Sequence, residues 1–273
     1  GMKIYISCDI EGVSGVTHPT HILPSGRDYE RARRWMTKEA NAAAEGALAA
    51  GAKEIIVNDA HGSMTNLLIE EIHPAVQLIT GSPKLLSMME GIDHSFDAAI
   101  FVGYHSRVNT PGVLSHSYDE RIVGGITLNG LEVGEFGLNA FLAGYYDVPV
   151  VAVTGDDILS DEVYRINPDI YTAIVKFAHG RFAARCLQSS CAEKLIWDTV
   201  KKALKAKNTI SACKMEGPID LEITFLSSGL AEAAASLPGT QQTAANKVLY
   251  KAENILEAYR ARIAMTTIAG EIL

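Results

Sequence analysis

The sequence has little positive charge. Among its 273 residues, 24 are Lys or Arg and 32 are Asp or Glu, which gives a net charge of −8 at pH 7. The densest basic group, Arg31, Arg33 and Arg34, lies in a segment that is typical of a helix and forms no larger patch. Phosphate backbones and anionic lipids bind basic surfaces. We therefore expect neither nucleic acid nor a membrane as a partner.

Long hydrophobic runs and paired cysteines are also missing. The longest apolar stretches, such as VPVVAV at 148–153, are too short to span a bilayer. Acidic residues interrupt the first apolar segment, so it does not read as a signal peptide. The four cysteines show no CxxC spacing, and a chain of this length needs no disulfide to fold. These features predict a cytoplasmic protein with free thiols.

Short apolar runs alternate with helical segments along the first part of the chain. The runs at 3–8, 53–59 and 98–105 read as strands, whereas 28–51 is rich in Ala, Arg and Glu and ends at a glycine, as helices often do. Buried strands that alternate with helices are typical of a parallel sheet. The sequence thus predicts an α/β fold with a mainly parallel sheet covered by helices on both faces.

The pattern changes in two places further along the chain. At 121–135 the dipeptide Asn129-Gly130 between apolar runs indicates a hairpin. After about residue 160 a new series of helices and strands predicts a second, smaller α/β portion. We place a first domain at 2–160 and the second portion at 161–273. This division allows the two to interleave, with a strand from the second portion completing the first sheet.

Polar side chains follow the predicted strands at the point where each strand ends. Asp9 and Glu11 follow the first strand one residue apart, which puts both on the same face of an extended chain. Asp59 and His61 follow the second long strand, and His105 follows the third. Open parallel sheets bind ligands at the carboxyl ends of their strands, so we expect these side chains to converge. Two further candidates flank the same region: His116 and Glu135.

Acids that converge in this way need a counter-ion, because otherwise they repel and one of them takes up a proton. No Lys or Arg lies near Asp9 and Glu11 in the sequence. Carboxylates and imidazoles together suit zinc or a similar divalent cation. Three acids with two or three histidines exceed what one four-coordinate zinc ion needs, so two ions bridged by one carboxylate fit better. Such pairs polarise carbonyls and activate water in aminopeptidases, phosphatases and nucleases.

Each candidate also has a purely structural interpretation. An acid after a strand can shape a turn or cap a helix, and Glu135 can favour a helix N-terminus through the dipole. His105 can be a core histidine with satisfied hydrogen bonds. We interpret Asp59 as a residue that orients His61 and not as a metal ligand. Convergence of the others at one sheet edge favours a functional site.

Seven stretches of the sequence form a specific set when they are taken together. The set resembles the zinc-dependent D-aminopeptidases that were first grouped with dipeptide transport proteins. The resemblance runs along nearly the whole chain and is densest over the first 157 residues. The stretches are DIEGVSG (9–15), YERARRWMTKEAN (29–41), VNDAHGSMTNL (57–67), GYHSR (103–107), TPGVLSHS (110–117), GEFGLNAFLAGYYDVPVVAVTGDD (134–157) and LEAYRA (256–261).

The resemblance implies an enzyme with two zinc ions per subunit. Carried over position by position, it implies that the metal ligands are Asp9, Glu11, His61, His105 and Glu135, with Asp9 as the bridge.

The resemblance also implies a catalytic residue, His116, outside the set of metal ligands. This residue is either the attacking group or a proton shuttle, and we favour proton transfer on chemical grounds. The family further implies a homo-oligomer, a ring-stacked decamer whose inner chamber admits small peptides. The segment at 118–133 is the least family-like, so substrate preference is least defined there.

The sequence therefore predicts a metal-dependent aminopeptidase that hydrolyses the N-terminal residue, preferably a D-amino acid, from short peptides or amino-acid amides. Two alternatives stay open. A two-metal phosphoesterase would use the same ions, but only Arg107 lies beside the motifs to recognise phosphate. A non-catalytic, metal-loaded oligomer that binds dipeptides would have no need of His116.

Overall fold

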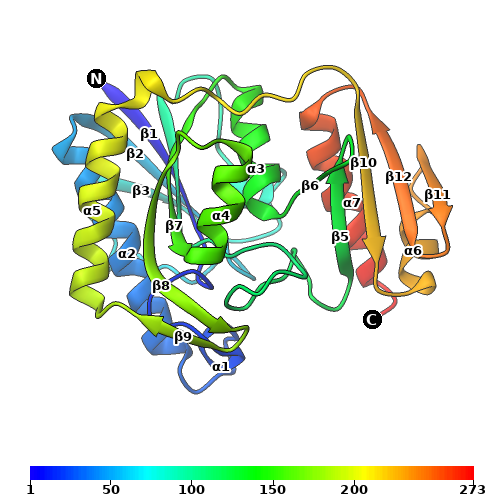
Figure 1. The fold of residues 1–273 in the computed structure, drawn as a ribbon, viewed down its shortest axis with the longest axis horizontal. Coiled ribbons are helices and arrows are strands. Elements are labelled where there is room, and N and C mark those ends of the chain that lie inside the picture. The colour runs from blue at the N-terminus through cyan, green and yellow to red at the C-terminus, as the bar shows by residue number, and fades with distance from the viewer.

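The computed structural model describes residues 1–273 and has two lobes, each built on one β-sheet (Figure 1). The strands of the larger sheet are β1 (Met2–Cys8), β2 (Ala52–Asp59), β3 (Val76–Ile79), β4 (Ala98–Val102), β7 (Val150–Asp156), β8 (Tyr171–Gly180) and β9 (Ala183–Cys186). Their order is β3-β2-β1-β4-β7-β8-β9, and every pair is parallel except β8 with β9. The predicted, mainly parallel sheet is confirmed.

Helices cover both faces of this sheet, as predicted. On one face, α2 (Tyr29–Ala49) packs against α5 (Ser189–Lys205), while α3 (Glu135–Tyr145) and α4 (Asp157–Ile166) cover the other (Figure 1). The buried side of α2 is mostly alanine, and a Cβ atom at Gly46 would lie 2.6 Å from the Trp197 carbonyl oxygen of α5. Small residues therefore let these two helices approach closely. Three short helices complete the lobe: α1 (Pro19–Ile22), η1 (Ser87–Met89) and η2 (Lys207–Thr209).

The smaller sheet is antiparallel. Its strands are β5 (Val123–Leu128), β6 (Leu131–Glu132), β10 (Ile219–Phe225), β11 (Thr240–Ala244) and β12 (Lys247–Ala252), in the order β11-β12-β10-β5-β6. The predicted hairpin at Asn129-Gly130 joins β5 to β6, with positive φ at both turn residues. Two helices, α6 (Ser228–Ala234) and α7 (Ile255–Gly270), pack on this sheet, and α7 also contacts α3 of the first lobe (Figure 1).

The chain contributes to the two sheets in an interleaved order. Strands β8 and β9 come from the predicted portion 161–273 but complete the larger sheet, because β8 pairs in parallel with β7 after the α4 crossover. Strands β5 and β6 come from the predicted domain 2–160 but belong to the smaller sheet. The sheets therefore do not follow a single boundary near residue 160, and the division into two domains stays a prediction.

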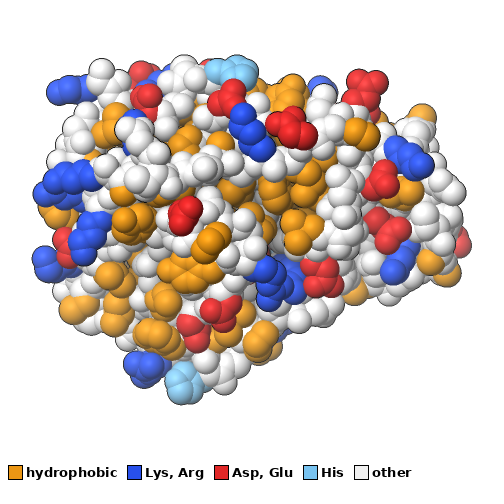
Figure 2. All heavy atoms as spheres, turned by 45° about the horizontal axis from the view of Figure 1, so that its top comes forward, with side chains coloured by type: hydrophobic (Ala, Val, Ile, Leu, Met, Phe, Trp, Pro, Cys, Tyr) orange, Lys and Arg blue, Asp and Glu red, His pale blue; other side chains and the backbone are white.

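The surface carries charges of both signs. On the face that Figure 2 shows, Lys and Arg side chains are interspersed with Asp and Glu. None of the helices is both long and apolar enough to cross a bilayer.

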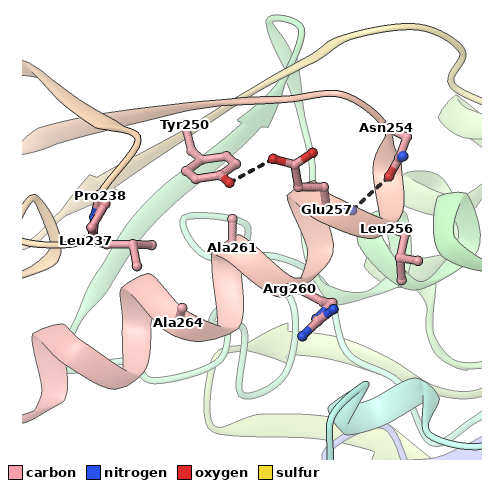
Figure 3. A pocket seen from close by; sticks show the side chains of 9 residues that line it. All are labelled: Leu237, Pro238, Tyr250, Asn254, Leu256, Glu257, Arg260, Ala261 and Ala264. Atoms are coloured by element: carbon pink, nitrogen blue, oxygen red, sulfur yellow. Dashed lines mark hydrogen bonds between the residues drawn. The ribbon is translucent and has the colours of Figure 1, made fainter.

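A cavity of about 400 Å³ lies on the second lobe beside α7 (Figure 3). Tyr250 donates a hydrogen bond to Glu257 Oε1 across it at 2.8 Å, and Asn254 caps the start of α7 by accepting from the Glu257 N–H. No histidine or cysteine lines this cavity, and none of the predicted site residues does.

Candidate metal centre

All six candidate residues meet at the carboxyl edge of the larger sheet. Strands β2, β1 and β4 are neighbours there, and each ends in a loop that carries one or two of these side chains. Glu135 is the first residue of α3, and His116 lies in the long loop between β4 and β5. The side chains around this point border a cavity of about 220 Å³. The residues brought together are Asp9, Glu11, His61, His105, His116 and Glu135.

Two of the imidazoles approach the carboxylates from opposite sides of Asp9. His61 Nδ1 lies 3.2 Å from Asp9 Oδ1 and 3.1 Å from Glu11 Oε1. His105 Nε2 lies 3.6 Å from Asp9 Oδ2 and 3.1 Å from Glu135 Oε2. One oxygen of Asp9 thus faces each imidazole. Three groups of these side chains could each hold a metal ion; two of them combine two carboxylates with one imidazole and share Asp9, and the third joins Glu11 to His105 and His116.

The electrostatics of this cluster favour added positive charge. Burial and the neighbouring Glu11 raise the pKa of Asp9 well above its ordinary value. Burial also acts against the charged form of Glu11, but His61, with His105 and His116, outweighs it and holds the pKa of Glu11 well below the ordinary value. Burial likewise disfavours charged His105, yet Glu135 raises the pKa of His105 well above the ordinary value. The acids therefore draw either protons or a cation to this edge.

The donor atoms fit a divalent metal ion. Glu11 Oε1 and His105 Nε2 are both buried and have no hydrogen-bond partner. Leaving a buried polar atom without a partner costs about 1–3 kcal/mol, and a coordinated cation would satisfy both atoms. Carboxylate oxygens and imidazole nitrogens are ligands that zinc accepts. The residues present therefore fit a zinc site.

The outer ring nitrogen of each histidine points at a main-chain carbonyl. The contacts are His61 Nε2 to Ile22 O at 2.8 Å, His105 Nδ1 to Ser106 O at 2.9 Å, and His116 Nδ1 to Leu114 O at 2.6 Å. A carbonyl only accepts hydrogen bonds, so the outer nitrogen carries the proton. When a cation takes the place of the second proton, the inner nitrogen can coordinate it, as ordinarily found for histidine ligands of metals.

Asp59 acts on the loop that carries His61 and not on the imidazole. Its carboxylate accepts hydrogen bonds from the main-chain N–H groups of Asn66 and Leu67, both at 2.7 Å, and from the His61 N–H at 3.4 Å. The Asn66 side chain bonds Asp59 at 2.9 Å and the His61 carbonyl oxygen at 2.6 Å. These contacts fix the turn after β2, which is consistent with the predicted orienting role.

His116 lies on the open side of the cluster. Its Nε2 atom is 3.4 Å from Glu11 Oε2 and 3.6 Å from Glu135 Oε2, and its ring stacks on His105 with 4.0 Å between centroids. The His116 side chain is 14% exposed, compared with 2% for His105. His116 and His61, which is 11% exposed, are therefore accessible to an incoming molecule, whereas His105 is not.

One residue of this region, Lys176, was not predicted from the sequence. Lys176 of β8 is completely buried, and its Nζ atom donates to the carbonyl oxygens of Glu11 at 2.5 Å, Val13 at 2.9 Å and Val16 at 2.6 Å. Burial lowers the pKa of Lys176 to about 8. This lysine holds the loop after β1 in place. The available signal was a single cation inside the apolar run YTAIVKF.

Comparisons with known proteins agree with this geometry. A family model described as D-aminopeptidase, peptidase family M55, matches residues 2–264. A D-aminopeptidase from Bacillus subtilis (strain 168) is 42% identical over 272 residues, with 98% of each chain covered. The solved structure of the zinc-dependent D-aminopeptidase DppA from Bacillus subtilis, described as a self-compartmentalizing protease, is 41% identical, has a TM-score of 0.96 and again covers 98% of each chain. The chain therefore belongs to the D-aminopeptidase family.

Proposed function

We propose that the protein is a D-aminopeptidase that binds two zinc ions through Asp9, Glu11, His61, His105 and Glu135, with Asp9 shared between them. The observation that carries this proposal is the pair of ligand groups that meet at the two oxygens of Asp9. Zinc bound there supplies a Lewis acid for the scissile carbonyl and activates water near neutral pH. The reaction removes the N-terminal residue from short peptides or amino-acid amides.

The cavity beside the cluster suits a small substrate. It measures about 220 Å³, and apolar atoms of Ala60, Met64 and Met88 line it together with the acids. The apolar residues provide space for one short side chain. The carboxylates attract the free ammonium group at the start of a peptide, because opposite charges concentrate in a cleft of one sign. This combination favours recognition of an N-terminal residue.

His116 supplies proton transfer in this proposal. Its Nδ1–H bond to the Leu114 carbonyl keeps Nε2 directed at Glu11 and Glu135. A base or acid placed at the mouth of the cavity can carry a proton to the leaving amine, which contributes roughly 10²- to 10⁴-fold to rate. The sequence-based preference for proton transfer over direct attack stays a prediction.

We also propose that the protein forms a homo-oligomer, a decamer with the sites inside a chamber, and that it is cytoplasmic. The description of the similar Bacillus subtilis structure as self-compartmentalizing supports assembly. A chamber of this kind would exclude folded proteins. Four unpaired cysteines, two of them exposed, support a reducing compartment.

The phosphoesterase alternative is not favoured by the surroundings of the site. Arg107, the one basic residue beside the motifs, has its guanidinium 3.0 Å from Glu132 and 3.6 Å from Glu162. Its charge is thus already paired and is not free to bind phosphate. Family membership also argues against this alternative and against a non-catalytic peptide-binding protein.

The direct test incubates the zinc-loaded protein with D-Ala-D-Ala and L-Ala-L-Ala in parallel and follows free alanine. We expect faster release from the D-peptide. A His116→Ala variant should keep its zinc and lose about two to four orders of magnitude in turnover. No release from either peptide with zinc bound would contradict the proposed activity, and near-normal turnover of the variant would remove His116 from the mechanism.

A further inference from the structure

The loop that carries His116 contains three residues in a strained region of the backbone. It connects β4 to β5 without a helix or strand of its own, and Asn109, Leu114 and Tyr118 all have positive φ angles, at 66°, 53° and 63°. Non-glycine residues adopt this region at a cost and persist there only where surrounding contacts impose it. Hydrogen bonds within the loop, such as Ser115 Oγ to the Thr110 carbonyl oxygen at 2.7 Å, impose part of this shape, and contacts from neighbouring elements impose the rest.

Two residues of the first lobe hold the main chain of this loop at Val113 and Tyr118. The Val113 N–H donates to Asp156 Oδ2 at 2.8 Å, and the Tyr118 N–H donates to Glu135 Oε2 at 2.8 Å. Neither contact reaches the two residues that come immediately before His116.

The tip of the β8–β9 hairpin contacts both of those residues, and it is the partner of the Leu114 N–H and the Ser115 carbonyl oxygen. The Arg181 carbonyl oxygen accepts the Leu114 N–H at 2.8 Å, and Arg181 Nε donates to the Ser115 carbonyl oxygen at 3.1 Å. The same guanidinium reaches Glu120 Oε2 through Nη2 at 2.5 Å. Arg181 thus joins three points of the loop at once.

The main chain of Leu114 links these contacts of Arg181 to the imidazole of His116. Its N–H is bound by the hairpin, and its carbonyl oxygen accepts the Nδ1–H of His116 at 2.6 Å. A shift of Leu114 would release Nδ1, and the ring would then be free to change its protonated nitrogen and to turn Nε2 away from Glu11 and Glu135. Arg181 makes none of the contacts within the cluster of acids and imidazoles, so it acts through the loop alone.

We propose that Arg181 is a positioning residue that holds His116 in its catalytic orientation. This inference rests on the proposed catalytic role of His116. Arginine suits the task because its planar fork donates to the Ser115 carbonyl and to Glu120 from separate nitrogen atoms, whereas lysine offers one compact ammonium group. The main-chain contact to Leu114 survives any substitution of the side chain, so the loss on truncation is partial.

The test is a double-mutant cycle on the zinc-loaded protein, with Arg181→Ala made both in the wild type and in His116→Ala. In the wild type, we expect kcat to fall about tenfold, because small misplacements of a catalytic group cost up to about 10² in rate. The KM, the zinc content and the melting temperature should stay close to wild type, and Arg181→Lys should recover part of the loss. In His116→Ala, Arg181→Ala should cause no further loss.

Arg185→Ala is the matched control. Arg185 lies on the same hairpin, but its guanidinium stacks over Phe177 at 4.4 Å and makes no contact with the loop. Its removal should leave kcat unchanged.

A second readout does not depend on turnover. In long-range proton–nitrogen NMR spectra of the histidine rings, the His116 signal, assigned by its absence in His116→Ala, should show Nδ1 protonated in the wild type. Arg181→Ala should show a mixture of tautomers.

Three results would overturn the inference. They are an unchanged kcat and tautomer in Arg181→Ala, an equal fold-loss in both backgrounds, or a fall in zinc content that accounts for the lost rate. If His116→Ala itself turned over normally, the catalytic role proposed for His116 would fail first, and the role of Arg181 would fail with it. If only the role of Arg181 were refuted, the proposed function would still stand.

Discussion

The two sheets of the molecule contribute very differently to the candidate site. In the larger, parallel sheet, β2, β1 and β4 end side by side, so the residues after them meet at one edge. In the smaller, antiparallel sheet, neighbouring strands end on opposite sides, and the cavity beside α7 holds no imidazole although it is larger. Strand direction, more than cavity size, decides where reactive groups gather.

The second lobe instead contacts the region of the site through a network of buried hydrogen bonds. Tyr259 of α7 donates to Asn139 Oδ1 at 2.8 Å, and Asn139 donates to the Tyr104 hydroxyl at 2.8 Å. The Tyr104 hydroxyl in turn bonds Ser7 Oγ of β1 at 2.7 Å. All four side chains are buried. This network joins the C-terminal helix to β1, the strand that precedes Asp9 and Glu11.

The largest effect should come from removing one of the proposed metal ligands at the ends of the parallel strands. Glu11→Ala removes a buried oxygen that no hydrogen bond satisfies and that lies 3.1 Å from His61 Nδ1. We expect the variant to lose at least one of the two proposed zinc ions, together with activity, and to melt at a lower temperature, because metal binding is coupled to folding. Elemental analysis of zinc per subunit and thermal melting measure this.

Glu132→Ala is the control for this variant, because the Glu132 side chain is 68% exposed and contacts only Arg107. An unchanged zinc content in Glu11→Ala would refute its assignment as a ligand and weaken the contrast between the two sheets.

The next largest effect should come from Lys176, the buried cation that binds the loop after β1. Lys176→Met leaves three carbonyl oxygens of the loop after β1 without their donor. We expect the free energy of unfolding to fall by about 3–5 kcal/mol. Urea unfolding measures this, with Lys205→Met, an exposed residue in the last turn of α5, as control. A change within about 0.5 kcal/mol, typical of surface substitutions, would show that the loop needs no such support.

A smaller effect should appear as pH dependence in the first lobe. Burial raises the pKa of Glu39 to about 8, and its Oε1 atom has no partner. The folded protein therefore keeps a proton that the unfolded chain releases above about pH 4.5. Glu39 stabilises the fold fully below that pH, and this stability is lost as the pH rises toward 8.

Glu39→Gln should therefore remove a slope of up to about 1.4 kcal/mol per pH unit, which amounts to about 2.5 kcal/mol between about pH 5.5 and 7.5. Urea unfolding of both proteins at matched zinc loading measures the difference. Parallel stability profiles for the two proteins would mean that Glu39 is ionised in the fold.

The smallest effect should come from the second lobe. Tyr250→Phe removes the hydrogen bond to Glu257 at the cavity beside α7 (Figure 3). We expect a loss of about 1 kcal/mol or less in stability, with zinc content and turnover unchanged. A substantial fall in turnover would show that this cavity affects catalysis, and the smaller sheet would then contribute to the site as well.

The residues at the strand ends could be predicted from the sequence, since two simple regularities apply to them. Side chains alternate along a strand, which puts Asp9 and Glu11 on one face, and parallel strands share one carboxyl edge, which brings His61 and His105 to the same place. The mainly parallel sheet and the turn at Asn129-Gly130 followed from similar local patterns.

The supports of the site could not be predicted in this way. Lys176 lies 165 residues from Glu11 in the sequence and binds main-chain carbonyls, which leave no side-chain pattern. Arg181 likewise bonds the main chain of a loop that is distant in the sequence. The assignment of β5 and β6 to the smaller sheet, and of β8 and β9 to the larger one, depends on tertiary pairing and not on local composition.

We propose above that Asp9 is shared between two zinc ions at the edge of the parallel sheet. Diffraction from crystals of the zinc-loaded protein, measured on both sides of the zinc absorption edge, tests it most directly. We expect two anomalous peaks roughly 3.5–4 Å apart, with one Asp9 oxygen beside each. A single peak, or a pair of peaks away from Asp9, would contradict it.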